Sequence, residues 1–224
     1  MSDNATAHNA RVYEAEVRRT IPFHGELLTQ AIDWALAAVP SPARWLDTGC
    51  GPGRLVAVAR AKAPWTKFYL ADPAPAMLDL ARGNNSDLPP EHFFEVPSDA
   101  LPDIGPVNVI TAVQCHHYSD PEGRSRAVRR CLSLLSPGGA LVVFENVRAE
   151  SDEGHALQRT RQASFLRAQG RSDAEVATHL AREGTKFFPI RPSEHIALLS
   201  TAGFRTVEMI WRSYGQAGFL AIAP

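Results

Sequence analysis

The clearest chemical signal in the sequence is a loop with glycines at alternate positions, Gly49, Gly51 and Gly53, in the segment 47–53. An apolar stretch precedes the loop and a helical stretch follows it. At such a junction the backbone N–H groups of the helix start lack partners, and glycines let a ligand approach them closely. The spacing fails G-x-G-x-x-G, because the third glycine would fall on Arg54 or Val56. No Lys-Ser or Lys-Thr pair follows, which excludes a phosphate-binding P-loop.

Asp72 and the pair His116-His117 are the other groups that could do chemistry. Asp72 comes nineteen positions after Gly53, at the end of a predicted strand, where its two oxygens could accept hydrogen bonds from ribose hydroxyls. The alternative is that Asp72 caps the helix starting at Ala74. His116 and His117 follow another predicted strand, and a histidine that titrates near neutrality suits a general base. Packing is the alternative for this pair. Two adjacent histidines without further ligands predict no metal site.

These groups need a framework that brings strand ends together. Strand-like runs at 44–46, 67–71, 92–96, 107–113 and 140–145 alternate with helical stretches. Strands connected by such helices form right-handed crossovers, and therefore a mostly parallel sheet covered on both faces. The sequence predicts a doubly wound α/β fold. Ligands of such folds bind at the carboxyl ends of the strands, where the glycine loop is expected to lie.

The two ends of the chain add helices and a hairpin. Residues 10–39 have the pattern of two helices joined at Ile21-Pro22-Phe23. The last strand-like runs, 206–212 and 216–223, have so short a connection that they must be antiparallel neighbours, which brings the sheet to seven strands.

Between residues 146 and 185 the alternation stops, and a polar, helix-favouring insertion appears. Most of its arginines are expected on a solvated helix face, while one or two could line the site. They are Arg148, Arg159, Arg161, Arg167, Arg171 and Arg182. We divide the single domain, 1–224, into a helical cap (1–40), a core (41–146), a helical lid (147–185) and a C-terminal helix and hairpin (186–224).

The composition is that of an ordinary globular protein. Of 224 residues, 45% are hydrophobic, and 23 basic side chains nearly balance 24 acidic ones. The balance gives no electrostatic argument for a nucleic-acid or membrane partner, so we expect neither. The start of the chain lacks an apolar leader and the apolar runs are too short for a bilayer, which predicts a cytoplasmic location. Cys50, Cys115 and Cys131 lack C-x-x-C spacing and are expected to be free thiols.

Five motifs in order resemble the class I S-adenosylmethionine-dependent methyltransferases. They are the glycine loop (46–55), the acidic motif around Asp72 (70–78), Ser98-Asp99-Ala100, the segment 107–118, and the approach to the fifth strand (135–144). The resemblance covers residues 41–146, and the terminal hairpin distinguishes this family from NAD-binding sheets. It implies S-adenosyl-L-methionine as cofactor, S-adenosyl-L-homocysteine as product and a small-molecule methyl acceptor.

The resemblance also implies roles for single residues. Asp72 would bind the ribose, Asp47 would act towards the methionine amino group, Asp99 would accept from the adenine amine and Met77 would pack on adenine. A structural role is the alternative for Asp47, Asp99 and Met77. The implied cofactor contacts are His24, Asp47, Gly49, Cys50, Gly51, Gly53, Asp72, Pro73, Met77, Asp99, Ala100 and Gln114. His116 and His117 are the predicted catalytic residues.

The helical start of the chain, 13–28, is similar to the lead-in of a subgroup that includes the carboxy-S-adenosylmethionine synthases. There an aromatic residue two positions after the proline approaches the cofactor, and His24 occupies that position here; a role at the helix junction is its alternative. Methyl transfer is the predicted reaction. One alternative is carboxy-S-adenosylmethionine formation, in which the sulfonium methyl becomes an ylide that attacks carbon dioxide and Arg182 binds the new carboxylate. Another is a non-catalytic cofactor-binding module.

Overall fold

Seven strands form one sheet in the order β3-β2-β1-β4-β5-β7-β6 in the computed structural model, which describes residues 13–224, with side chains from residue 16. Neighbouring strands from β3 to β5 run parallel, and β7 runs antiparallel to both β5 and β6. The strands are β1 (Arg44–Thr48), β2 (Lys67–Ala71), β3 (Phe93–Phe94), β4 (Val107–Val113), β5 (Leu135–Asn146), β6 (Thr206–Ser213) and β7 (Gln216–Ile222). The predicted fold class is confirmed.

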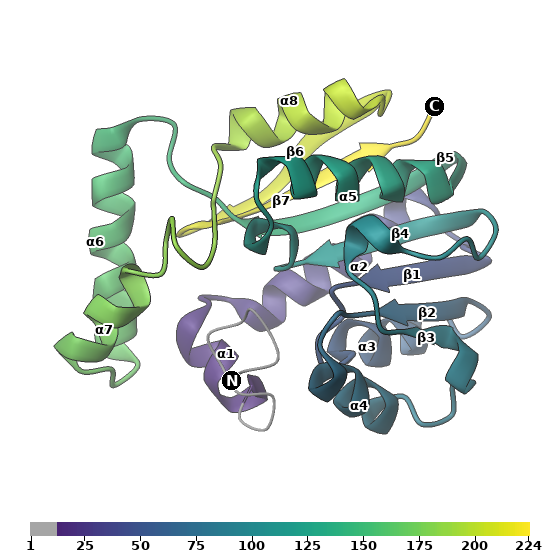
Figure 1. Ribbon diagram of the computed structural model, residues 1–224, viewed down its shortest axis with the longest axis horizontal. Coiled ribbons are helices and arrows are strands. Elements are labelled where there is room, and N and C mark those ends of the chain that lie inside the picture. Colours follow the sequence, from purple (N-terminus) through teal and green to yellow (C-terminus); the bar gives the residue numbers. More distant parts are fainter. Residues whose placement is uncertain (1–12) are drawn as a thin grey trace.

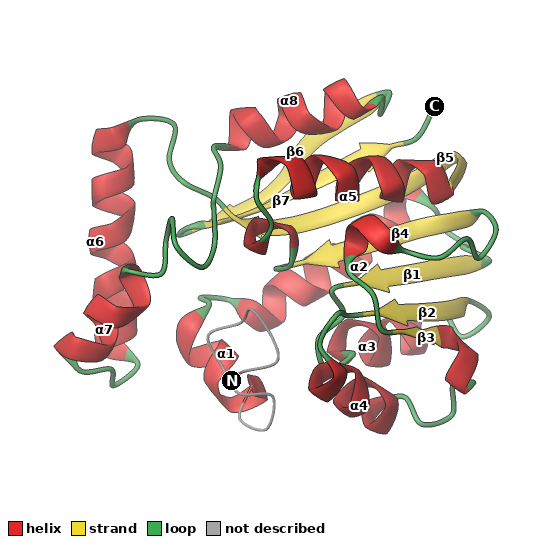
Figure 2. Cartoon of the chain, in the orientation of Figure 1, coloured by secondary structure: helices red, strands yellow, loops and turns green. Residues whose placement is uncertain are grey.

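Helices cover both faces of this sheet (Figure 2). One face carries α2 (His24–Ala38), α3 (Arg54–Lys62) and α4 (Pro75–Asn84), and the other carries α5 (Pro121–Leu134) and α8 (Pro192–Ala202). Successive strand side chains point to opposite faces, so Val109 of β4 packs into the first core and Ile110 into the second. Because both faces are covered, the central strands are buried along most of their length and mostly apolar, with Asp47 and Thr111 as buried polar exceptions.

Three helices lie beyond the carboxyl ends of the parallel strands: α1 (Tyr13–Thr20), α6 (Asp152–Ala168) and α7 (Asp173–Leu180). Figure 1 shows the arrowheads of β1, β2 and β4 pointing towards them. The lid helices α6 and α7 share a small core of their own, made by Ala163, Leu166 and Val176. The cap and the lid therefore stand at the edge where ligands of this kind of sheet bind.

Several predicted boundaries differ from the observed ones. The helix break at 21–23 is confirmed, with Phe23 in the left-handed region (φ 56°), whereas residues 10–12 lie outside the described part of the chain. The third strand, predicted over 92–96, is only Phe93–Phe94: His92 ends the 3₁₀ turn Pro90–His92, and residues 95–97 have no regular structure. The predicted turn 136–139 lies within β5, where the register with β4 skips from Leu135 to Ala140.

Candidate active site

A cavity lies beside the glycine loop at the carboxyl ends of β1, β2 and β4. Most of the predicted cofactor contacts line it, together with one predicted catalytic residue; Gly53, Asp99, Ala100 and His117 do not. Those that line it are His24, Asp47, Gly49, Cys50, Gly51, Asp72, Pro73, Met77, Gln114 and His116. We call this space the first cavity.

The glycines of the loop serve different purposes, although all three have positive φ. A Cβ on Gly49 would lie 2.2 Å from the Cβ of Cys115, and one on Gly53 would lie 2.7 Å from Nδ2 of Asn85. A Cβ on Gly51 would meet nothing within 4 Å. Gly49 and Gly53 are therefore required by packing, whereas Gly51 faces open space where a ligand could approach the backbone.

Asp72 holds the loop and the next helix with one carboxylate. Its Oδ2 accepts a hydrogen bond from the Gly51 N–H at 2.8 Å, and its Oδ1 accepts one from the Ala74 N–H at 2.9 Å. Ala74 is the residue from which α4 starts. The bond to Ala74 is the capping contact expected on structural grounds, and the position in the first cavity is what the ribose role requires.

Asp47 is buried at the end of β1, directly beside Thr111 of β4. The Thr111 hydroxyl donates to Asp47 Oδ1 at 2.6 Å and accepts from the indole N–H of Trp45 at 3.0 Å. Burial raises the pKa of Asp47 to about 7, aided by the charge of Asp72 and opposed by the Thr111 hydrogen bond. The carboxyl group of Asp47 therefore changes its protonation state near neutral pH.

Glu145 at the end of β5 holds the turn that carries the two histidines. Its oxygens accept hydrogen bonds from the backbone N–H groups of His116 and His117, each at 2.9 Å. One of them is also hydrogen-bonded to Nδ1 of His117. The other ring nitrogen of His117 lies 3.1 Å from Nδ2 of Asn146. Burial alone would raise the pKa of Glu145, but its hydrogen bond and charge interaction with His117, together with His116 and His195, lower it to about 2. His117 is therefore occupied as a structural partner.

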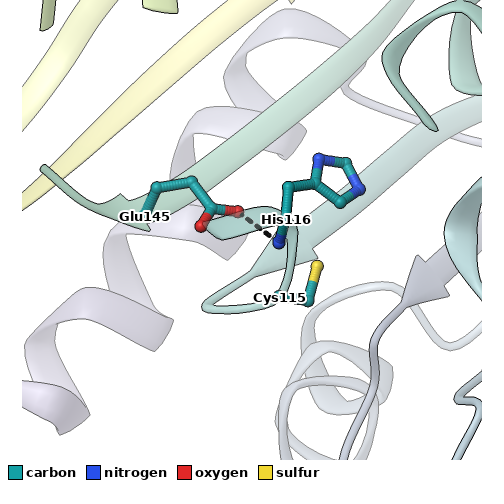
Figure 3. Close-up of side chains that lie close together, drawn as sticks. All are labelled: Cys115, His116 and Glu145. Atoms are coloured by element: carbon teal, nitrogen blue, oxygen red, sulfur yellow. Dashed lines mark hydrogen bonds between the residues drawn. The ribbon is translucent and has the colours of Figure 1, made fainter. Parts of the chain in front are cut away.

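His116 differs from its neighbour, because both of its ring nitrogens are buried without a hydrogen-bond partner. Figure 3 shows its ring directed away from Glu145, which its backbone N–H contacts. Burial lowers the pKa of His116, so the ring is neutral at pH 7. Ligand atoms of Cys115, His116 and Glu145 lie within 4.8 Å of one another. However, both Glu145 oxygens already accept N–H bonds, and burial raises the pKa of the Cys115 thiol, so neither Glu145 nor Cys115 is a ready metal ligand.

Two lining residues have unusual surroundings. Burial lowers the pKa of His24, the first residue of α2, to about 4, so its ring is also neutral at pH 7. Gln114 has a φ of 56°, which is rare for a residue with a side chain, and its N–H is bonded to the carbonyl of Phe144 at 2.6 Å. This backbone form turns the chain sharply as it leaves β4.

Two of the residues predicted to contact the adenine part of the cofactor, Asp99 and Ala100, do not line the first cavity. Asp99 forms an ion pair with Arg126 (Oδ2 to Nε, 3.1 Å), while Pro97 and Ser98 line the first cavity in its place. The Ser98 hydroxyl is hydrogen-bonded to that of Thr48 at 2.8 Å. Ser98 belongs to the segment that resembles the family's adenine-contacting loop, although only Asp99 and Ala100 of that segment are predicted as individual contacts. Tyr118, which follows the predicted His117, is not among the individual contacts predicted from the sequence.

A second cavity lies beside the first, between α1, the lid and the end of β5. Gln114 and Tyr118 line both cavities. Two of the six lid arginines, Arg159 and Arg182, line the second one. Burial raises the pKa of Tyr118 to about 12, although a hydrogen bond from Arg182 and its charge oppose the shift. The remaining lid arginines are not in its lining.

In the part of the chain that the structure describes, no helix is both long enough and apolar enough to span a bilayer.

Curated relatives align along nearly the whole chain. The carboxy-S-adenosyl-L-methionine synthase of Hydrogenovibrio crunogenus is 24% identical over 220 residues, which cover 94% of this chain and 85% of the relative. The enzyme of the same name from Wolinella succinogenes is 27% identical over 218 residues, which cover 95% and 90%.

Solved structures share the fold at lower identity. An O-methyltransferase family protein from Burkholderia thailandensis superposes with a TM-score of 0.70 at 17% identity, over 97% of this chain and 61% of its own. This chain thus spans about three fifths of that protein's length. The N-methyltransferase NodS from Bradyrhizobium japonicum, solved with S-adenosyl-l-homocysteine, gives a TM-score of 0.60 at 15% identity, over 98% and 94%.

A family model described as a methyltransferase domain matches residues 17–209. The match runs from α1 through β6 and includes the cap helices, the glycine loop and the lid. The resemblance seen in the five motifs is thereby confirmed, and the chain belongs to the methyltransferase domain family.

Proposed function

We propose that the protein binds S-adenosylmethionine in the first cavity and transfers its methyl group to a small molecule in the second. The observation that carries this proposal is the meeting of the two cavities at Gln114 and Tyr118. In-line transfer needs the acceptor atom, the methyl carbon and the sulfur on one line, so two neighbouring cavities that share lining residues suit it. One structural neighbour was solved with the product cofactor, S-adenosyl-l-homocysteine, which supports the same cofactor here.

Four residues are proposed to hold the cofactor. Asp72 accepts from the ribose hydroxyls, Asp47 accepts from the amino group, Gly51 allows close approach and Met77 packs on the adenine ring. Bound S-adenosylmethionine supplies a methyl group on a positively charged sulfur, whose leaving thioether is neutral and needs no acid. The protein therefore contributes alignment, and a base where the nucleophile carries a proton.

His116 is the member of the predicted pair that reaches the first cavity, and two roles are proposed for it. It could take the acceptor's proton, or it could contact the cofactor through its unpartnered nitrogens. His117 contributes by holding Glu145. A cytoplasmic location and the absence of nucleic-acid and membrane partners stay predictions.

Calorimetry with S-adenosylmethionine tests the cofactor site. Asp72→Ala should weaken binding by at least about tenfold, because hydrogen bonds to a charged group contribute roughly 1.5–3 kcal/mol. Asp79→Ala is a matched control, since Asp79 is an exposed aspartate on the neighbouring helix α4 that pairs with Arg82. Unchanged affinity in the Asp72 variant would refute the ribose assignment.

A second candidate reaction is formation of carboxy-S-adenosylmethionine. It is favoured by the names of the relatives, two of which align over more than nine tenths of this chain, and by the position of Arg182 in the second cavity. Mass spectrometry of the bound cofactor after incubation with prephenate decides between the two reactions. Carboxylation adds the mass of carbon dioxide, whereas an unchanged S-adenosylmethionine mass argues against carboxylation. Absence of turnover on every acceptor would favour the binding-module alternative.

A further inference from the structure

The lid contains a histidine and a glutamate in the arrangement of a general base and its orienting carboxylate. Nε2 of His155 on α6 lies 2.7 Å from Oε1 of Glu183, which follows α7. The second oxygen of Glu183 accepts from Nη1 of Arg159 at 2.6 Å. Because the carboxylate oxygens of Glu183 accept hydrogen bonds, the contact with His155 places the ring proton on Nε2.

This arrangement leaves Nδ1 of His155 as the free acceptor of the ring. That nitrogen is buried and has no hydrogen-bond partner. His155, Arg159 and Glu183 all line the second cavity, whereas His116 lines only the first. An unpartnered acceptor inside a cavity is costly unless a ligand supplies a donor. Of the two described histidines that line the second cavity, His155 and His179, His155 is therefore the one whose ring nitrogen is buried without a hydrogen-bond partner and can receive a proton.

The rest of the lining indicates what kind of molecule this is. The Oε1 atoms of Gln162 and Gln216 are also buried without partners, so the cavity offers several hydrogen-bond acceptors. Its described lining residues include two guanidinium groups, those of Arg159 and Arg182, and one carboxylate, that of Glu183. That balance favours an oxygen that becomes negative and disfavours an ammonium group. His179 shares the cavity and adds no negative charge.

We propose that His155 is the general base of the transfer, held by Glu183 and Arg159, and that the acceptor carries a weakly acidic hydroxyl of the phenol or enol type. The inference rests on the proposed function. The hydroxyl proton moves to Nδ1 of His155. A lone pair of the acceptor oxygen forms the new bond to the methyl carbon while the carbon–sulfur bond breaks, and that bond's electron pair stays on sulfur. His116 then keeps the cofactor-contact role.

The proton transfer can be measured without any turnover. Para-nitrophenol changes absorbance when it ionises, so it reports its own protonation state when bound to the full chain saturated with S-adenosyl-L-homocysteine. In the wild-type protein, we expect the apparent pKa of the bound probe to fall by about one unit or more relative to His155→Asn. The groups facing His155 are Glu183 and Arg159, with His179 and Arg182 in the same cavity.

Two further variants separate the base from its support. Glu183→Gln keeps the side-chain shape but removes the charge that favours the imidazolium, so its effect on the probe should be intermediate. Glu153→Gln is the matched control, because Glu153 is exposed in the first turn of α6. Equal ionisation of the probe in the wild-type protein and His155→Asn would overturn the proposal. So would a probe that does not bind.

A second test of the proposal measures methyl transfer from labelled S-adenosylmethionine to phenol. His155→Asn should lower turnover by about 10²–10⁴-fold, the usual contribution of a general base, while cofactor affinity stays unchanged. Transfer to amines with none to phenols in the wild-type protein would refute the hydroxyl acceptor. If the protein fails to bind S-adenosylmethionine at all, the proposed function fails, and the para-nitrophenol titration, repeated on the protein without the product cofactor, still decides the role of His155.

Discussion

Asp47 and Asp72 end neighbouring strands at the same cavity, but their carboxylates have different partners. Asp72 accepts two backbone N–H groups, which fixes the glycine loop and the start of α4. Asp47 receives one hydroxyl, that of Thr111, and burial raises its pKa to about 7. Asp72 therefore holds the backbone of the site in place, whereas Asp47 is the residue whose charge can change when a ligand binds.

We predict that cofactor binding releases a proton from Asp47. In the free protein the carboxyl is mostly protonated below its pKa of about 7. A positively charged amino group beside it favours the carboxylate, so the pKa falls on binding and affinity rises as the pH increases from about 6 to 7. Calorimetry in buffers of different ionisation enthalpy measures the released proton. Binding without proton release at pH 6.5, or the same release from Asp47→Asn, would contradict the assignment.

The glycine loop and the strand ends could be predicted because they depend on neighbours in sequence. Gly49, Gly51 and Asp72 lie at the cavity as expected. Asp99 does not, because its side chain pairs with Arg126 of α5, a contact that only the folded chain creates. Likewise, nothing in the local sequence links His117 to Glu145 or His155 to Glu183. Each of these pairs is separated by 28 positions and depends on how two elements pack.

Alanine substitutions in the loop should separate packing from binding. In Gly49→Ala the new methyl group would overlap Cys115, so we expect unfolding in urea to show a loss of about 2–4 kcal/mol from overpacking and positive-φ strain. Gly51→Ala has no such clash and should lose only about 1–2 kcal/mol, from the positive φ. Its methyl group enters the first cavity, so cofactor affinity measured by calorimetry should fall more than stability does. The opposite ranking of the two variants in stability would contradict this account of the loop.

The molecule as a whole consists of a sheet with two cores and a lid with a third, and polar contacts with α1 are among those that attach the lid. Arg171 of the lid forms an ion pair with Glu16, Gln162 donates to the carbonyl of Thr20 at 3.0 Å, and Arg19 donates to the carbonyl of Gln169 at 2.8 Å. Such contacts can open without disturbing the buried strands. Both cavities can then admit their ligands by a local movement of cap and lid.

Removal of the charge on Glu16 should therefore loosen the lid and leave the sheet intact. We expect Glu16→Gln to increase amide hydrogen exchange in α6 and α7 by roughly two- to fivefold, because a partly exposed ion pair contributes only modestly to stability. Exchange in β1, β4 and β5 should not change, since global unfolding controls those amides. Asp173→Asn is the matched control, as it breaks the Arg167–Asp173 pair within the lid and leaves the contact with α1 in place. If exchange rose equally in the lid and the central strands, the lid would unfold only together with the sheet, and ligand entry would need another route.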